Sequence, residues 1–353
     1  MRAYAVKMFC EPVEAIDLPD PAPQGTEVVI EVTRCGVCHS DLHIQDGYYD
    51  LGGGKKLSLG DRGVALPVVL GHEVLGRLVA KGPDAPIGDD QIGKTFLVHP
   101  WLGCGTCRLC LNGEENLCAK PASIGVYRAG GYAEKCLVPH PKFLVDVTGI
   151  DPTLAATYAC SGVTAYGALK KATIDRADDW LMIVGMGGVG FSGLQIARAL
   201  GFRNIIVADI DAAKRDLASD NGATFVIDPR DASAQALLLE KTGGGVAAVV
   251  DFVGASATGS FSVASLRKAG IYIAVGLFGG DITLSMPLIV IRALTVRGSY
   301  VGSLIELKEL IELVKTGKVA PMPVETVPMA QANAALERLR AGHVNGRLVL
   351  ARA

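Results

Sequence analysis

A six-residue glycine-rich run, Gly185–Gly190 (GMGGVG), restricts the possible fold more than any other feature of this chain. It follows the apolar stretch Leu181–Val184, which is typical of a buried strand, and it precedes an amphipathic stretch that predicts a helix. A G-x-G-x-x-G run is weak evidence alone, but a strand before it and a helix after it predict a dinucleotide-binding turn. Its glycines permit a tight turn, close approach of the backbone to a pyrophosphate and close packing of helix on strand. The residues of the turn that we expect at the cofactor are Gly185, Gly187, Gly188, Val189 and Gly190.

A carboxylate follows at the place where the ribose of a bound dinucleotide would lie. Asp209 comes nineteen residues after the turn, at the end of the apolar strand predicted over Ile205–Val207. It could accept hydrogen bonds from both ribose hydroxyls, and it would repel a 2′-phosphate. Ile210 and Asp211 follow it in place of an arginine, and Lys214 could reach a ribose hydroxyl. The sequence therefore favours NAD over NADP.

The chain changes character near residue 150. Before this point, frequent prolines and alternating stretches such as Val28–Val32 predict short strands and turns. After it, Asp151-Pro152 predicts the start of a helix, and further buried strands are expected over Ala247–Phe252 and Ile271–Val275. The apolar stretch Met286–Val296, interrupted by a proline and an arginine, is interpreted as one more strand. Strands that alternate with helices in this way predict a parallel α/β sheet.

Four of the nine cysteines lie within fifteen residues, in the spacing C-x2-C-x2-C-x7-C: Cys104, Cys107, Cys110 and Cys118. Four thiolates this close can surround one zinc ion tetrahedrally, and a site with four protein ligands is structural. An iron–sulfur cluster uses the same ligands, and the spacing alone does not exclude it. A zinc ribbon that binds nucleic acid is disfavoured, because Glu114 and Glu115 accompany Arg108, the one basic residue of this lobe.

Composition and charge limit the function further. The 34 basic and 36 acidic residues give a formal charge of −2, which offers no electrostatic footprint for nucleic acid. The odd cysteine count argues against a disulfide framework and for metal binding. No apolar signal-peptide region follows the first ten residues, and no stretch approaches the ~18 apolar residues of a membrane span. We therefore expect a cytoplasmic protein that binds neither nucleic acid nor membranes.

Three further segments are unremarkable when each is taken alone: the run Cys38–His43 (CHSDLH), the run Gly71–Glu73 (GHE) and the isolated Cys160. Cys35 and Cys38 could form a redox C-x-x-C pair, and a lone buried cysteine usually belongs to the core. Together with the four-cysteine lobe and the glycine-rich turn, however, the set resembles the zinc-dependent medium-chain alcohol dehydrogenases. The resemblance extends over essentially the whole chain, in order and at matching intervals.

The resemblance implies an α/β fold with two domains. We expect an N-terminal GroES-like, β-rich catalytic domain and a Rossmann cofactor domain with a doubly wound parallel sheet. The catalytic domain would be discontinuous, comprising residues 1–153 and 298–353, and the NAD-binding domain would span residues 154–297. Homodimers or homotetramers that join through edge strands of the cofactor domain are also implied, and the apolar segment Leu288–Val296 is compatible with them.

The resemblance also implies a catalytic zinc, and hence two zinc ions per subunit. Its matching ligands are Cys38, His72 and Cys160. These leave one position open for water or substrate, as in catalytic zinc sites. Glu73 would approach the metal from behind, and Asp41 would orient the ligand histidine. Ser40 and His43 match a relay that carries the proton from the substrate oxygen, through the ribose, to solvent.

Further cofactor contacts are implied outside the turn. His39 and Arg347 would face the phosphates, and Thr164 would contact the nicotinamide. The residues whose backbone groups would hold the nicotinamide ring are Val253, Val275 and Leu277.

The implied reaction is the reversible oxidation of an alcohol to an aldehyde or ketone, with hydride transfer to NAD⁺ and zinc as Lewis acid. Tyr49 and Trp101 resemble aromatic residues that narrow the pocket in bacterial and yeast members, although each could equally be core. The segment Gly47–Pro67 is longer than the matching loop of many relatives and could reshape the substrate entrance. A polyol dehydrogenase, or another specialised dehydrogenase with the same metal, is the alternative. Zinc-free quinone reductases and lens-type structural members share the fold but lack the catalytic ligands.

Overall fold

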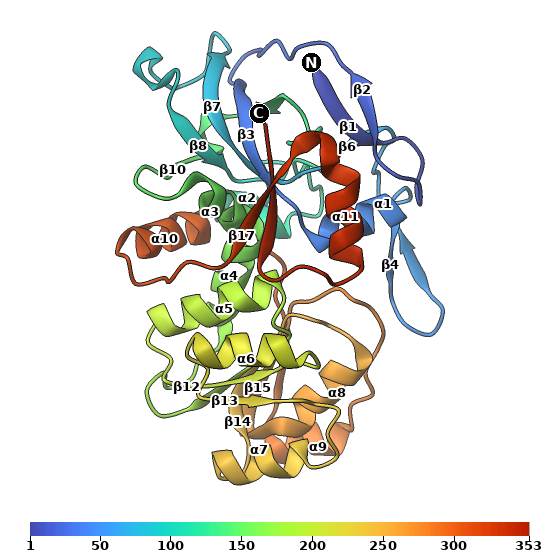
Figure 1. Cartoon of the computed structure of the whole chain (residues 1–353), viewed down its shortest axis with the longest axis vertical. Helices are drawn as coiled ribbons and strands as arrows, with labels where there is room; N and C mark the ends of the chain where they lie inside the picture. The colour runs from blue at the N-terminus through green and yellow to red at the C-terminus, as the bar shows by residue number, and fades with distance from the viewer. Residues whose placement is uncertain (353) are drawn as a thin grey trace.

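The computed structural model describes residues 1–352 and has two parts arranged along its long axis (Figure 1). The upper part in this view is rich in strands and contains both chain ends, and the lower part holds a sheet flanked by helices. One large apolar core extends through both parts, and a second, smaller core lies in the lower part alone.

The lower part is built on six parallel strands in the order β13-β12-β11-β14-β15-β16. Their bounds are β11 (Trp180–Val184), β12 (Asn204–Ala208), β13 (Phe225–Ile227), β14 (Val246–Asp251), β15 (Leu266–Ala274) and β16 (Thr295–Gly298). This order, which reverses between β11 and β14, is that of a doubly wound dinucleotide-binding sheet. The predicted fold class is therefore confirmed, and the point of reversal is where such sheets bind ligands.

Burial on both faces explains why the central strands are continuous apolar runs. In β11, Leu181 and Ile183 belong to the large core, whereas Met182 and Val184 belong to the smaller one. A parallel strand covered on both sides has no solvent face on which polar residues could alternate. The strand predicted over Leu181–Val184 is confirmed for this reason.

The helices that follow or flank these strands are α4 (Val163–Lys171), α5 (Gly188–Ala199), α6 (Ala212–Asp220), α7 (Ala234–Thr242), α8 (Ser256–Ser265) and α9 (Met286–Arg292). The strand prediction over Met286–Val296 is wrong for most of its length. Pro287 lies in the first turn of α9, where its missing N–H is not needed for an intrahelical bond, so it starts a helix instead of interrupting a strand. The edge strand β16 begins only at Thr295.

The upper part contains a seven-stranded sheet in which strands from both ends of the chain meet. Its strands are β3 (Val28–Gly36), β7 (Glu73–Lys81), β8 (Thr95–Val98), β9 (Lys135–Val138), β10 (Leu144–Asp146), β17 (Val324–Pro328) and β18 (Arg347–Ala351). β18 pairs antiparallel with β3, with Val349 opposite Gly36. The C-terminal segment thus completes the sheet that the N-terminal segment begins, as the red and blue strands show in Figure 1.

Smaller elements complete this part. A three-stranded sheet and a hairpin comprise β1 (Arg2–Val6), β2 (Glu14–Asp17), β6 (Val68–Val69), β4 (Tyr48–Asp50) and β5 (Lys56–Ser58). The remaining helices are α1 (His39–Asp46), α2 (Arg108–Leu111), α3 (Pro152–Thr157), α10 (Leu304–Lys315) and α11 (Ala332–Arg340). Single turns are η1 (Asp89–Gln91), η2 (Glu115–Leu117), η3 (Pro141–Phe143), η5 (Met329–Gln331) and the π-helical η4 (Tyr158–Gly162). None of the helices in residues 1–352 combines the length and apolar character needed to cross a membrane.

Two helix starts follow from capping side chains. The carboxylate of Asp151 accepts the backbone N–H of Leu154 at 2.9 Å and so begins α3, as predicted. In α10, the Ser303 hydroxyl accepts the N–H of Glu306 at 3.2 Å, while the Glu306 carboxylate accepts the N–H of Ser303 at 2.8 Å. This reciprocal capping box satisfies two N–H groups that a helix start leaves without partners.

Candidate functional site

Three side chains from distant segments meet where the two parts of the molecule adjoin. Cys38 caps the start of α1, His72 precedes β7, and Cys160 lies in η4, which packs on both α5 and β7. The Sγ atoms of Cys38 and Cys160 are 3.8 Å apart, and all three side chains are buried. Their ligand atoms, with a carboxylate oxygen of Glu73, all lie within 4.8 Å of one another. The structure thus brings together the four residues predicted around a catalytic metal.

The chemistry of this cluster fits a zinc ion. Two sulfurs bound tetrahedrally to one zinc at about 2.3 Å lie ~3.8 Å apart, which is the separation found between the two thiols. Nε2 of His72 and Oε2 of Glu73 are buried without a hydrogen-bond partner in the described chain. Burying such atoms is costly unless something binds them.

The hydrogen bond between the two thiols shifts their pKa values in opposite directions. A hydrogen bond from the Cys160 thiol lowers the pKa of Cys38 well below the usual thiol value, against the opposing effect of burial. The same hydrogen bond raises the pKa of Cys160. Cys38 is therefore the more acidic thiol of the pair, and the thiolate is the form of cysteine that binds metal.

Asp41 fixes the geometry of two of these ligands. Its Oδ1 lies 3.3 Å from Nδ1 of His72, which leaves Nε2 as the nitrogen available to a metal. Its Oδ2 accepts the backbone N–H of Cys38 at 2.9 Å and the hydroxyl of Tyr132 at 3.2 Å. A carboxylate held in this way sets the orientation of the imidazole and raises its basicity. Sequence reasoning identified Asp41 but missed Tyr132, because no local pattern marks it.

Arg347 connects this cluster with the glycine-rich turn. Arg347 is 4% exposed, and its guanidinium forms an ion pair with Glu73 through Nη2 and Oε1. Its side chain also lies against Gly188 so closely that a Cβ at Gly188 would overlap it. Burial raises the pKa of Glu73 to about 7, and Arg347 opposes this shift. Nε of Arg347 has no hydrogen-bond partner in residues 1–352. Arg347, which is predicted to contact a cofactor phosphate, therefore has one N–H group that is not used within the described chain.

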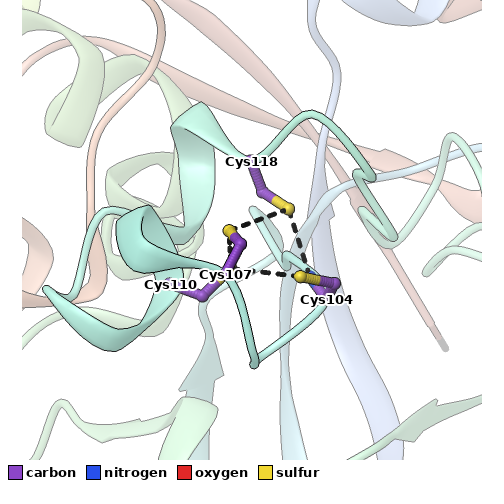
Figure 2. A group of neighbouring side chains, drawn as sticks. All are labelled: Cys104, Cys107, Cys110 and Cys118. Carbon is purple, nitrogen blue, oxygen red and sulfur yellow. Dashed lines mark hydrogen bonds between the residues drawn. The ribbon is translucent and has the colours of Figure 1, made fainter.

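The four-cysteine lobe forms a second compact cluster, with the thiols pointing toward one another (Figure 2). Cys107 lies 3.5 Å from Cys110 and 3.8 Å from Cys118, and Cys104 lies 4.0 Å from Cys110, all between Sγ atoms. These separations again bracket the ~3.8 Å expected for tetrahedral thiolates on one zinc ion. Several iron atoms placed between the sulfurs would need wider spacing. Backbone donors, chiefly that of Thr106, lower the pKa of Cys104 to about 5.

The nine cysteines form no disulfide within the described residues. All nine are free thiols, and all lie within the described residues. The disulfide framework that the odd count argued against is therefore absent from residues 1–352.

The turn after β11 has the geometry that its glycines predicted. Gly185 has φ +86°, in the left-handed region that favours glycine. A Cβ at Gly190 would overlap the carbonyl oxygen of Gly185, so only glycine allows α5 to start this close to β11. The space beside Gly187 is open to 4 Å, and Val189 is packed partly into the core.

Asp209 lies directly after β12 and faces the turn. Its Oδ2 accepts the backbone N–H of Met186 at 2.6 Å, and its Oδ1 accepts that of Asp211 at 2.8 Å. The carboxylate is thus held at the turn, where a ribose would meet it. Lys214, in the first turn of α6, lies near the N-cap Asp211, whose side chain accepts its backbone N–H at 3.4 Å.

The residues predicted around a nicotinamide follow the carboxyl ends of the central strands. Val253 and Val275 come just after β14 and β15, and Leu277, next in the same loop, is 44% exposed. On α4, the hydroxyl of Thr164 is buried and has no hydrogen-bond partner in the described chain, which fits a group waiting for a ligand. Sequence reasoning missed Asp251, which holds this region together.

Asp251 is fully buried and organises the loop after β14. It accepts the backbone N–H groups of Val253 at 2.9 Å and Gly254 at 3.0 Å, and the hydroxyls of Thr258 at 2.8 Å and Tyr272 at 3.0 Å. The available signal was an acidic residue at the end of an otherwise apolar strand.

The predicted relay and pocket residues lie beside the first cluster. Ser40 and His43 are half-buried on α1, one turn apart, and His39 is exposed at its start. The ring of His43 lies 5.0 Å from that of Tyr49.

Trp101 is buried against the cluster itself. Its ring centroid is 5.2 Å from that of His72, and its indole N–H donates to the carbonyl of Ala159 at 3.1 Å. The ring of Tyr300, which sequence reasoning missed, lies 6.3 Å from Trp101 and extends this aromatic wall.

The long segment 47–67 forms the hairpin β4–β5, which reaches the lower part of the molecule (Figure 1). A Cβ at Gly52 would lie 2.8 Å from the carbonyl carbon of Gly280, and one at Gly279 would lie 2.8 Å from Cβ of Asp50. The hairpin therefore touches the loop that follows Leu277, beside the predicted nicotinamide contacts.

Comparison with known families agrees with this geometry. Residues 24–149 match the model described as alcohol dehydrogenase GroES-like domain, and residues 188–316 match the one described as zinc-binding dehydrogenase. The first match covers the segment that carries Cys38, His72 and the four-cysteine lobe. The second begins within the glycine-rich turn.

Similar proteins align along the whole chain. An NAD-dependent alcohol dehydrogenase of Sulfurisphaera tokodaii is 37% identical over 99% of both chains. The alcohol dehydrogenase structure from Aeropyrum pernix superposes with a TM-score of 0.89 at 30% identity, covering 99% of this chain and 100% of that one. The D-arabinose dehydrogenase structure from Sulfolobus solfataricus gives a TM-score of 0.83 at 28% identity, with 99% and 98% covered. The chain therefore belongs to the zinc-dependent medium-chain alcohol dehydrogenase family.

Proposed function

We propose that this enzyme oxidises a small alcohol reversibly to an aldehyde or ketone, with NAD⁺ as hydride acceptor and zinc held by Cys38, His72 and Cys160. The observation that carries the proposal is the buried cluster of these three side chains. Its thiols have the separation of a tetrahedral zinc site, and Nε2 of its imidazole lacks a partner in the described chain. Arg347 joins this cluster to the turn expected to hold the cofactor phosphates.

The roles of the chain's own groups follow from their positions. When bound, zinc supplies Lewis-acid polarisation that lowers the pKa of the substrate alcohol. Asp41 holds the ring of His72 in place, and Ser40 and His43 carry the released proton away along α1. Burial lowers the pKa of His43 below its ordinary value, so this imidazole is neutral at pH 7 and able to accept a proton.

The two parts of the molecule divide this work. We assign the catalytic unit to residues 1–153 and 298–353 and the cofactor unit to residues 154–297. The pairing of β18 with β3 supports the discontinuous assignment. The nine free thiols also support a reducing, cytoplasmic setting.

A polyol or sugar dehydrogenase is the second candidate. The neighbour from Sulfolobus solfataricus is described as a D-arabinose dehydrogenase, and it covers nearly the same length. The aromatic wall of Trp101 and Tyr300 favours a less polar substrate, because it offers apolar surface and few hydrogen-bond partners.

A substrate screen, combined with a variant that lacks one proposed zinc ligand, tests the reaction. NADH formation should be measured over primary, secondary, aromatic and polyhydroxy alcohols with the zinc-loaded enzyme. The variant His72→Ala should lower kcat by about 1,000-fold or more, because Lewis-acid catalysis supplies several kcal/mol of transition-state stabilisation. NADH affinity should be largely kept. His140→Ala, which alters a capping residue of η3, is the matched control and should retain turnover. Full activity of His72→Ala would refute the zinc mechanism.

Metal analysis tests the lobe. The intact protein should contain about two zinc ions per subunit, and Cys104→Ser should reduce the content to about one. Loss of a structural metal should lower the free energy of unfolding by more than about 4 kcal/mol, measured by urea denaturation. Cys10→Ser removes an exposed thiol outside both clusters and should change neither value. Stoichiometric iron, or zinc content unaffected by Cys104→Ser, would contradict the assignment.

Two substitutions at Asp209 test cofactor selection. Asp209→Ala should raise KM for NAD by about tenfold or more, since hydrogen bonds to a charged group contribute about 1.5–3 kcal/mol. Asp209→Asn keeps an acceptor for the Met186 N–H but removes the charge, so it should mainly relax the exclusion of NADP. Asp216→Asn, on the exposed side of α6, is the charge-matched control. An unchanged preference in both Asp209 variants would place the ribose contact elsewhere.

We also propose that the enzyme is a homodimer or homotetramer joined at β16. All four residues of this edge strand are exposed, and the adjoining helix exposes Val290 by 74% and Ile291 by 66%. Apolar surface beside an open strand edge favours pairing with a second copy. Light scattering should therefore detect an oligomer that Val290→Asp/Ile291→Asp converts to monomers. Met8→Asp, at a residue 61% exposed elsewhere, should leave it intact. A monomeric wild type would overturn this proposal.

A further inference from the structure

An open cavity of about 710 Å³ lies at the end of α5 remote from the glycine-rich turn. Its walls include Arg198 of α5, Phe202 and Arg203 of the connection to β12, and Lys318 of the segment between α10 and β17. With a rise of 1.5 Å per residue, Arg198 is about 15 Å along the helix from Gly188. The cavity is therefore separate from the site of the reaction.

The cavity concentrates positive charge. Three of its lining residues are cationic, and none of those described is acidic. No ion pair of at most 4.0 Å within residues 1–352 involves Arg198, Arg203 or Lys318. On a chain with formal charge −2, three unpaired cations around one cavity are a local excess. Such an excess favours a multiply charged anion.

The end of α5 does not account for this charge. Cations near a helix C-terminus are favoured because they satisfy its last carbonyl groups. Here Arg176 donates to the carbonyl of Leu200 at 3.1 Å, and Arg198 donates to that of Asn221, beyond the end of α6, at 2.9 Å. The side chains of Arg203 and Lys318 make no hydrogen bond within the described chain, so their donors are left for a ligand.

The floor of the cavity suits an organic body. Ala199 and Ala320 provide apolar lining, and Phe202, which is 4% exposed, adds a small part of its surface. The volume is also far larger than one inorganic phosphate requires.

The cavity connects the two units of the enzyme. Gln195 and Ala320 line it, and they also line a small void behind it that is closed by Tyr158 of η4 and Met322. A ligand in the cavity would therefore contact α5 and the 318–322 segment. Both of these pack near η4, the turn that carries Cys160.

We propose that this cavity is a second ligand site, which binds a small organic molecule carrying at least two phosphate groups. Arg203 and Lys318 supply the charge that recognises the phosphates, and Arg198, which also donates to the carbonyl of Asn221, adds a third positive charge. The apolar floor contacts the organic part.

Calorimetric titration tests the site on the full-length, zinc-loaded enzyme saturated with NADH, so that the dinucleotide site is already occupied. Fructose 1,6-bisphosphate is the probe, because it carries two phosphates and no adenine. Saturable binding with Kd below about 1 mM is expected. Arg203→Gln/Lys318→Gln should weaken it by at least tenfold and leave turnover unchanged. Inorganic pyrophosphate should bind more weakly, because it makes no contact with the floor.

A charge-matched variant separates a site from general attraction. Lys268→Gln/Lys308→Gln removes two exposed cations outside the cavity and should not alter binding. The proposal fails if no saturable binding occurs, if the two double variants weaken binding equally, or if the probe displaces NADH. Pyrophosphate binding as tight as the bisphosphate would refute the organic part of the proposed ligand.

Discussion

The buried ion pair between Arg347 and Glu73 is the interaction on which the arrangement of the site depends. Glu73 begins β7 next to the ligand His72, and Arg347 begins β18, so the pair joins strands from opposite ends of the chain. The same arginine lies against Gly188 at the start of α5. Breaking one side of a buried ion pair costs about 3–5 kcal/mol, because it leaves an uncompensated charge. Arg347 therefore links the metal cluster, the cofactor turn and the C-terminal strand.

Features carried by a few consecutive residues could be predicted from the sequence. The glycine-rich turn and the Asp151 cap each depend on spacing within one segment, and the structure forms both. The hydrogen bond from Tyr132 to Asp41 could not be predicted, because it joins residues 91 positions apart and no local pattern marks the tyrosine. The error at α9 had a different cause. Pro287 was interpreted as an interruption, although proline in a first helical turn is as consistent with a helix start.

The two cysteine clusters differ in what determines their geometry. The lobe takes all four thiols from one short segment, so its shape follows from local turns around α2 and η2. The other cluster takes Cys38, His72 and Cys160 from three elements, and its geometry is set by the fold as a whole. The π-helical turn η4 shows how: it packs on α5 and β7 and so places Cys160 3.8 Å from Cys38. Such turns are frequent at functional sites, because the wider turn redirects side chains. Position within the fold, and not spacing, therefore makes this cluster suitable for catalysis.

The two ends of helix α5 have opposite electrostatic character. Its N-terminus offers free N–H groups and the positive end of the helix dipole to phosphates, and Arg347 adds a charge there. Its C-terminus has the negative end of the dipole, which Arg176 offsets by binding the carbonyl of Leu200, while Arg198 binds the carbonyl of Asn221 at the end of α6. The remaining charge of Arg203 and Lys318 exceeds what the helix end requires. The cavity and the cofactor turn lie at opposite ends of this one 12-residue helix. The two sites are therefore built on a common structural element, although no side chain is common to them.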